Sequence, residues 1–290
     1  MRRLQPWKGA DRITRPTPKG SCGSWGCQDG CRDGCGRDLI SASSRFVRHR
    51  GNEGSSVSGR TLAIGDIHGC DFALTVLLGA VSPTSADTVV VLGDVVDRGG
   101  GSKQAIDLLL QLRQATNLVF IRGNHEEMMM QSPADRNCRE AWLKFGGLNT
   151  LFSYGGGLES VPPDHWEFLN SAVDFFETPE AVFIHANLEP GVALEQQRPQ
   201  WLRWTHLSGQ ELPLSSGKLV VCGHTPQKSG LPLVRPGWIC LDTFACGSGW
   251  LTCFDIASGV AYQANEKRQS RQLTLEEIAA ESVKLAATTP

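Results

Sequence analysis

The sequence predicts an α/β protein in which a largely parallel sheet, covered by helices, is joined by a second sheet. Five short apolar runs rich in β-branched residues carry this prediction, because uninterrupted runs of this kind form strands that are buried on both faces. Helical patterns separate the first three runs, which is the alternation of βαβ units. The runs are Leu62–Ile64, Thr88–Leu92, Leu118–Ile121, Ala181–Ile184 and Leu219–Cys222.

The helices follow from apolar residues at helical spacing. This spacing predicts helices over Phe72–Val81 and Lys103–Ala115, between the first three strands. The pattern is helical again over about Ala134–Phe152 and Asp164–Phe176, which predicts a helical insert of about residues 127–178 over one side of any site.

The C-terminal third is expected to complete the fold with strands and one helix. Three apolar segments after Gly237 predict antiparallel strands that finish the second sheet: Trp238–Leu241, Trp250–Ile256 and Val260–Tyr262. Thr274 and Glu277 have the spacing of a capping box, which predicts a short amphipathic helix through Leu285.

Charge divides the chain of 290 residues into two segments. Residues 1–60 carry 12 Lys and Arg against 5 Asp and Glu, whereas the remaining 230 residues carry 16 against 25. The basic segment lacks a periodic apolar face, so residues 1–59 are predicted to be a disordered tail and residues 60–290 a catalytic domain. The tail's Cys22, Cys27, Cys31 and Cys35 are spaced more widely than the cysteine pairs of zinc ribbons, which disfavours a zinc site.

Composition also bears on location and partners. No apolar run reaches the roughly 18 residues of a membrane span, and no apolar region follows Arg2-Arg3 as an export signal requires. The scattered cysteines of the folded part suit a reducing cytoplasm. The basic tail permits weak, salt-sensitive binding to nucleic acid without any recognition motif. We therefore expect a cytoplasmic protein, monomeric, with no membrane association and no specific nucleic-acid partner.

The candidate site lies where the five strands end. The carboxyl ends of parallel strands meet at one edge of a sheet, so polar residues far apart in the chain can converge there. The residues at these ends offer oxygen and imidazole ligands, a set that suits two divalent ions such as manganese, iron or zinc. Two such ions are a common device for hydrolysing phosphate esters. The candidate ligands are Asp66, His68, Asp94, Asn124, His185 and His224.

Three neighbouring residues fit the chemistry of phosphate-ester hydrolysis. Arg98 offers the forked donor that binds phosphate oxygens in pairs. His125, next to Asn124, is placed to protonate a leaving alkoxide, and Asp97 can hold its imidazole in the useful tautomer.

The motifs Gly65-Asp66-Ile67-His68-Gly69, Gly93-Asp94-Val95-Val96-Asp97-Arg98-Gly99 and Gly123-Asn124-His125-Glu126 resemble the signature of the phosphoprotein phosphatase branch of the metallophosphoesterases. Trp142 with Gly146-Gly147 is similar to the insert of the small bacterial and phage-lambda-type serine/threonine protein phosphatases. This resemblance, over about residues 60–256, implies the calcineurin-like fold, a four-layer α/β/β/α sandwich of two mixed sheets.

The resemblance also implies roles for individual residues. Asp66 and His68 would bind the first metal ion and Asp94 would bridge both ions, while Asn124, His185 and His224 would bind the second. His125 would be the general acid, paired with Asp97. A second phosphate-binding arginine is expected between the last two histidines, and Arg203 is assigned to it, with Arg198 as the alternative. The bacterial members usually have glycine after a Leu-Asp-Thr like that of residues 241–243, whereas this chain has Phe244.

The function predicted from these residues is hydrolysis of phosphoserine and phosphothreonine in proteins, by attack of a metal-activated hydroxide on phosphorus. The alternative is hydrolysis of symmetrical diadenosine tetraphosphate or another small phosphoester. Hydrolases of that kind resemble this signature but typically lack an acid at the position of Asp97. A non-catalytic scaffold is a third interpretation, which the complete ligand set disfavours.

Overall fold

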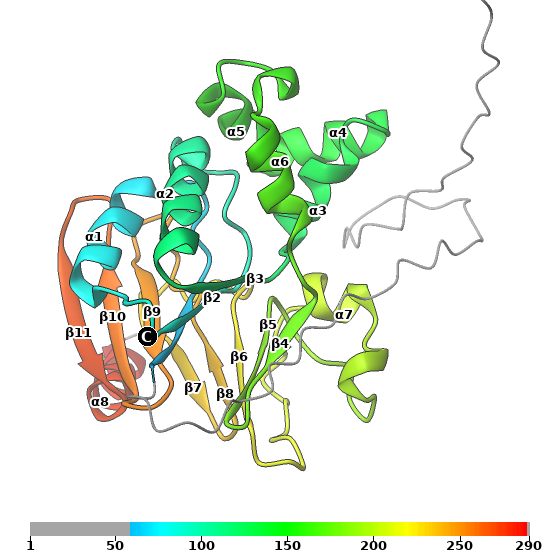
Figure 1. The fold of residues 1–290 in the computed structure, drawn as a ribbon. Coiled ribbons are helices and arrows are strands. Elements are labelled where there is room, and N and C mark those ends of the chain that lie inside the picture. Colours follow the sequence, from blue (N-terminus) through cyan, green and yellow to red (C-terminus); the bar gives the residue numbers. More distant parts are fainter. Residues whose placement is uncertain (1–58, 289–290) are drawn as a thin grey trace, which may run out of the picture. The chain divides into compact units, whose positions relative to one another are not determined.

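The computed structural model describes residues 59–288, and the predicted tail's four cysteines lie outside this range. The βαβ alternation at the start of the described part is as predicted (Figure 1). The first three strands pair in parallel, with Ala63 opposite Val90 and Val90 opposite Val119. The elements are β1 (Thr61–Ile64), α1 (Asp71–Val81), β2 (Thr88–Val91), α2 (Ser102–Ala115) and β3 (Asn117–Phe120).

The first sheet is mixed, with strand order β11-β10-β9-β1-β2-β3. Its antiparallel half differs from the prediction, which assigned the segments after Trp250 to the second sheet. The strand beginning at Leu251 pairs instead with β1 in antiparallel orientation, and Ala63 lies opposite Phe254. The added strands are β9 (Leu251–Asp255), β10 (Val260–Ala264) and β11 (Ser270–Thr274).

The second sheet has the order β4-β5-β6-β8-β7 and is also mixed. Its strands β5 and β6 are the fourth and fifth predicted runs, and they pair in parallel. The predicted helix through Phe176 is wrong at its end, because Phe175 and Phe176 pair with β5 as an edge strand. The strands are β4 (Phe175–Glu177), β5 (Ala181–Ile184), β6 (Leu219–Cys222), β7 (Leu233–Arg235) and β8 (Trp238–Cys240).

The two sheets pack face to face, and this packing forms the main core. Side chains of both sheets meet there, including Ala63 and Val90 from the first sheet and Phe183 and Val221 from the second. Burial of these apolar surfaces is the principal stabilising contribution. Helices α1 and α2 lie on the outer face of the first sheet (Figure 1). The predicted arrangement of two mixed sheets with helices is thus confirmed.

The outer face of the second sheet has a thinner cover. Its apolar side chains, among them Val182 and Val220, pack with Leu202 of α7 (Pro199–Trp204) and with leucines of the flanking loops. This fourth layer therefore consists of one short helix and coil. No helix in residues 59–288 is long and apolar enough to cross a membrane.

The helical insert and the last helix complete the described chain. The insert consists of short helices, and one of the breaks is at Gly146, whose φ of 113° interrupts the helical backbone before α5. At the C-terminus, Glu277 N donates to Thr274 Oγ1 at 3.2 Å and Thr274 N donates to Glu277 Oε2 at 2.8 Å, so the predicted capping box is present. The helices are α3 (Asn124–Gln131), α4 (Arg136–Trp142), a π-helical turn (Leu143–Gly147), α5 (Leu148–Ser153), α6 (Pro163–Asn170) and α8 (Leu275–Thr288).

Candidate metal centre and active site

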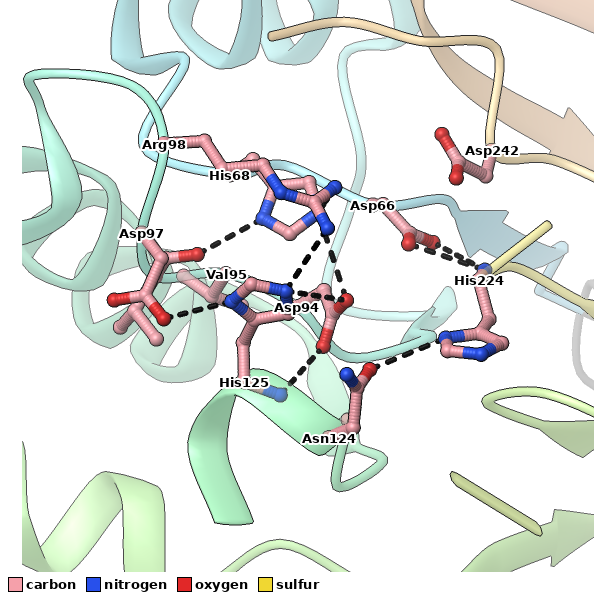
Figure 2. A network of polar contacts seen from close by, with 12 residues as sticks. Asp66, His68, Asp94, Val95, Asp97, Arg98, Asn124, His125, His224 and Asp242 are labelled. Atoms are coloured by element: carbon pink, nitrogen blue, oxygen red, sulfur yellow. Dashed lines mark hydrogen bonds and ion pairs between the residues drawn. The ribbon is translucent and has the colours of Figure 1, made fainter. Parts of the chain in front are cut away.

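The predicted site residues come from the carboxyl ends of strands in both sheets. Asp66 and His68 follow β1, Asp94 follows β2, and Asn124 begins α3 directly after β3. His185 and His224 follow β5 and β6 of the second sheet. Figure 2 shows side chains of these elements turned toward one another. The face-to-face packing of the two sheets is therefore what joins the two sets of residues.

Asp94 is the centre of this cluster and is almost completely buried. Its Oδ2 lies 3.5 Å from His68 Nε2 and 3.9 Å from His125 Nε2, while its Oδ1 lies 3.5 Å from His185 Nε2. Among the described residues, two groups of side chains have the spacing to hold a metal ion, and Asp94 belongs to both. The groups are His68, Asp94 and His125, and Asp94, His185 and His224.

Three imidazoles around Asp94 are oriented by backbone carbonyls. Each ring uses one nitrogen on a carbonyl oxygen and turns the other toward Asp94 or Asn124, which is the usual support of a metal-binding histidine. Burial lowers the pKa of all three rings, that of His224 to about 3, so the rings are neutral and have a lone pair to offer. The bonds are His68 Nδ1 to Val96 O at 3.0 Å, His185 Nδ1 to Leu92 O at 2.8 Å, and His224 Nε2 to Trp204 O at 3.1 Å.

Asn124 joins the two histidines of the second sheet. Its Oδ1 lies 3.0 Å from His185 Nε2 and 3.1 Å from His224 Nδ1. A neutral oxygen donor beside two imidazoles and a shared carboxylate matches what divalent ions of intermediate hardness bind. The donor set therefore fits two divalent ions.

Asp66 lies at the edge of the cluster. Both of its carboxylate oxygens accept from His224 N at 3.1 Å, and it belongs to neither of the two close groups found in residues 59–288. Burial raises the pKa of Asp66, and the negative charges of Asp242 and Asp94 raise it further. A cation beside Asp66 would relieve this repulsion.

Glu126 is a site residue that the sequence reasoning did not single out, although it ends the third motif. Its carboxylate is fully buried and accepts hydrogen bonds from the backbone of two loops. Burial, together with the charge of Asp94, raises its pKa to about 7. Through these backbone hydrogen bonds, Glu126 holds the loop that carries Asp94 against the start of α3. The donors are Asp94 N and Val95 N at 2.8 Å, Gly123 N at 3.0 Å and Val96 N at 3.3 Å.

His125 and Asp97 form a buried pair next to the cluster. His125 Nδ1 lies 2.7 Å from Asp97 Oδ2. Burial lowers the pKa of His125, but the carboxylates of Asp94 and Asp97 outweigh it and raise the pKa above its ordinary value. The imidazole can therefore carry a proton on Nε2, the ring nitrogen that lies 3.9 Å from Asp94 Oδ2.

Arg98 is exposed, and its guanidinium lies next to the imidazoles of His68 and His125 (Figure 2). Its Nη1 is 2.8 Å from His68 Nε2, and its Nη2 is 3.1 Å from His125 Nε2. A forked donor at this place is accessible to a substrate and adjoins the group formed by His68, Asp94 and His125.

The two arginines considered for a second phosphate contact are both paired with carboxylates. Arg203 is buried and binds Glu127 at 2.9 Å and also Asp174, and its Nε has no hydrogen-bond partner in the described part of the chain. The charge of Arg203 is close enough to contribute to the lowered pKa of His185. Arg198 is exposed and paired with Glu189 at 2.6 Å.

Phe244 adopts the backbone conformation that favours glycine. Its φ is 63°, in the left-handed region, which is a physical reason to expect glycine there, as the resemblance implied. A Cβ on Gly247 would lie 2.1 Å from the Phe244 ring, so the ring packs directly on this glycine.

The profile of one protein family, described as calcineurin-like phosphoesterase, matches residues 59–228. The chain belongs to this family. The predicted enzyme class, a metal-dependent hydrolase of phosphoric esters, is confirmed by this membership. The calcineurin-like fold implies divalent metal ions, and the donor set around Asp94 fits them.

Curated relatives of this calcineurin-like phosphoesterase fall into two groups. A serine/threonine-protein phosphatase, rdgC of Drosophila melanogaster, is 41% identical over 81 residues, which are 27% of this chain and 12% of the fly protein. The symmetrical bis(5'-nucleosyl)-tetraphosphatase of Sodalis glossinidius is 40% identical over 67 residues, 23% of each chain. The asymmetrical bis(5'-nucleosyl)-tetraphosphatase PrpE of Anoxybacillus flavithermus is 26% identical over 234 residues, 65% of this chain and 87% of that protein.

Solved structures support the fold of the calcineurin-like phosphoesterase. A candidate diadenosine tetraphosphatase aligns with a TM-score of 0.54 at 22% identity, over 75% of this chain and 94% of the other. A cold-active protein-tyrosine phosphatase of a Shewanella species aligns with a TM-score of 0.53 at 15% identity, over 74% of this chain and 80% of the other. At these identities the likeness establishes the fold alone.

Proposed function

We propose that the protein is a dinuclear metal-dependent phosphomonoesterase that hydrolyses phosphoserine and phosphothreonine in proteins. The His125–Asp97 pair, joined at 2.7 Å beside Asp94, carries this proposal. Cleavage of an alkyl phosphate expels an alkoxide, which is a poor leaving group unless an acid protonates it. An anhydride expels a stable phosphate and has much less need of such a pair.

The metal ions belong to the same proposal. Asp66, His68 and Asp94 would hold one ion, and Asp94, Asn124, His185 and His224 the other. Such ions, when bound, polarise the phosphoryl oxygens and lower the pKa of a coordinated water. Manganese, a cytoplasmic location and a monomeric state are further parts of the proposal.

The chain's own residues supply binding and proton transfer. Arg98 would bind phosphoryl oxygens through its guanidinium, whose two Nη atoms lie next to His68 and His125. His125 would donate its Nε2 proton to the departing oxygen while Asp97 holds Nδ1. Arg203 remains the proposed second phosphate-binding arginine. Its ion pairs with Glu127 and Asp174, which are not among the candidate metal ligands, would hold it in position.

A second candidate function is hydrolysis of dinucleoside tetraphosphates. One structural observation favours it, namely a cavity of about 730 Å³ lined by residues that include Trp201, His206 and Trp238. His206 also stacks on His224, with ring centroids 4.4 Å apart, so the cavity adjoins the metal-binding group. Ligand cavities of this size accept small molecules, and a nucleoside has the aromatic surface to pack against tryptophan.

A comparison of rates on two substrates distinguishes the two candidate functions. Rates are measured on a phosphoserine peptide and on diadenosine tetraphosphate at equal concentration, in manganese buffer with and without a chelator. The proposal expects the peptide to have the larger kcat/KM. A larger kcat/KM for the dinucleotide would replace the proposed function with the second candidate.

A further inference from the structure

The helical insert contacts Asp97 through two buried side chains. Trp142, the last residue of α4, donates from Nε1 to both carboxylate oxygens of Asp97, at 3.0 Å and 2.9 Å. Thr150 of α5 donates from Oγ1 to Asp97 Oδ1 at 2.6 Å. Trp142 and Thr150 are each 0% exposed, so water does not compete for these bonds. Together with His125 Nδ1, these donors account for every polar partner of the Asp97 side chain among the described residues.

The insert also supports the backbone of the same turn. Asp97 and Arg98 have φ of 74° and 65°, in the left-handed region that costs a non-glycine residue about 1 kcal/mol. Asp97 N donates to Thr150 Oγ1 at 2.9 Å, and Arg98 N donates to Gly146 O at 3.3 Å. Asn149 Nδ2 donates to Arg98 O. Hydrogen bonds to residues 48 to 53 positions away in sequence thus hold a backbone conformation that is unfavourable by itself.

Close packing fixes the indole of Trp142 in its place. A Cβ on Gly147 would lie 2.5 Å from the indole ring, so only glycine lets the π-helical turn approach the ring this closely. A buried tryptophan needs one acceptor for its N–H, and a backbone carbonyl usually suffices. Here the acceptor is the carboxylate that also binds His125, which ties the insert to the proposed proton donor.

We propose that Trp142 and Thr150 are positioning residues for general-acid catalysis. They hold Asp97 as an oriented carboxylate, and Asp97 in turn fixes the tautomer and direction of the His125 imidazole. This inference rests on the proposed phosphomonoesterase function. The helical insert is then part of the machinery that protonates the leaving group.

The leaving group provides the test. An alkyl phosphate, such as a phosphoserine peptide, needs the proton of His125, whereas p-nitrophenyl phosphate releases a nitrophenolate that is stable without it. We expect Trp142→Phe and Thr150→Val to lower kcat on the peptide about tenfold or more, and on p-nitrophenyl phosphate by a clearly smaller factor, because general-acid catalysis contributes about 10²–10⁴-fold. Thr150→Ser keeps the hydroxyl and should restore most of the peptide rate.

A matched control and a double-mutant cycle separate positioning from general damage. Trp166→Phe replaces a partly buried tryptophan of α6 and should leave both rates unchanged. In an Asp97→Asn background, the peptide-specific effect of Trp142→Phe should largely vanish, because both changes act through one carboxylate. If Trp142→Phe does not fold, the Thr150→Val and Thr150→Ser pair gives the same comparison.

Two outcomes would overturn the inference while leaving the proposed function intact. One is an equal loss on both substrates in Thr150→Val, and the other is full additivity of Trp142→Phe with Asp97→Asn. The proposed function itself fails differently, through the absence of chelator-sensitive activity on phosphomonoesters in the unaltered protein.

Discussion

The two ends of the first sheet carry carboxylates in different electrostatic environments. At the amino ends of β1 and β2, Asp87 accepts from Arg60 N at 2.7 Å, from Arg60 Nη2 at 2.8 Å and from Thr84 N at 2.8 Å. Hydrogen bonds from Arg60 hold the pKa of Asp87 well below its usual range. This carboxylate is fully matched by its neighbours and stabilises the fold.

The site at the opposite, carboxyl end, which strands of the second sheet also join, is arranged for chemistry at the expense of stability. Burial raises the pKa of Glu126 to about 7 and that of Asp242 to about 6. Eight non-glycine residues in positions 59–288 have positive φ, and five of them belong to this site: His68, Asp94, Asp97, Arg98 and His224. Such concentrations of backbone strain and mismatched charge are typical of functional sites. Changes at the two ends should therefore affect different measurements.

The largest expected effect is at Asp94. Asp94→Asn keeps the size of the side chain but removes the carboxylate that both metal-binding groups share. We expect kcat to fall by about a thousandfold or more, which corresponds to several kcal/mol of transition-state stabilisation. Steady-state rates in manganese buffer measure this, and an unchanged circular dichroism spectrum shows that the fold is retained. Retained activity would refute the bridging role.

His125→Gln should have the next largest effect, and it should depend on the leaving group. The rate on a phosphoserine peptide is expected to fall by about 10²–10⁴-fold, since the proton donor is lost. The rate on p-nitrophenyl phosphate should fall less. Equal activity of variant and unaltered protein on the peptide would show that the general-acid assignment is wrong.

The sequence predicts some structural features of these regions better than others. The strand ends were predicted correctly because β-branched runs followed by Gly, Asp or His are local signals. The assignment of Leu251–Asp255 to the first sheet was not predicted, since strand pairing is set by packing between distant segments. The bonds from Trp142 to Asp97 join residues 45 apart in the chain, and no local pattern reveals such a partner.

At the opposite end of the sheet, Asp87→Asn should affect stability and spare activity. Removing a carboxylate that accepts hydrogen bonds from Arg60 and Thr84 should lower the free energy of unfolding by about 2 kcal/mol. Urea denaturation measures this. Glu140→Gln, at an exposed ion pair with Arg136, is the control and should change it by less than about 0.5 kcal/mol. A loss of kcat in Asp87→Asn at low temperature would contradict the separation of the two ends.

The smallest expected effect is a difference in the pH dependence of stability. The pKa of Asp87 is lowered by folding, so its contribution is present above its unfolded value of about 4 and is lost as the pH falls below it. The pKa of Asp242 is raised to about 6, so its ionisation opposes folding and stability is lost as the pH rises from about 4 through 6. In chelator-treated protein, Asp242→Asn should remove part of this second loss, of about 1 kcal/mol. Urea denaturation at pH 4.5 and pH 7 compares the two proteins, and an unchanged pH slope in the variant would contradict the assignment.

The central claim is that the strand ends of two sheets form a dinuclear metal centre that hydrolyses phosphate monoesters. The most direct measurement is phosphate release from a phosphoserine peptide by the full chain and by Asp94→Asn, before chelation, after chelation and after manganese is restored. We expect activity in the unaltered chain that disappears with the chelator and returns with manganese, and almost none in Asp94→Asn under any condition. Activity that survives chelation, or that is equal in the two proteins, would contradict it.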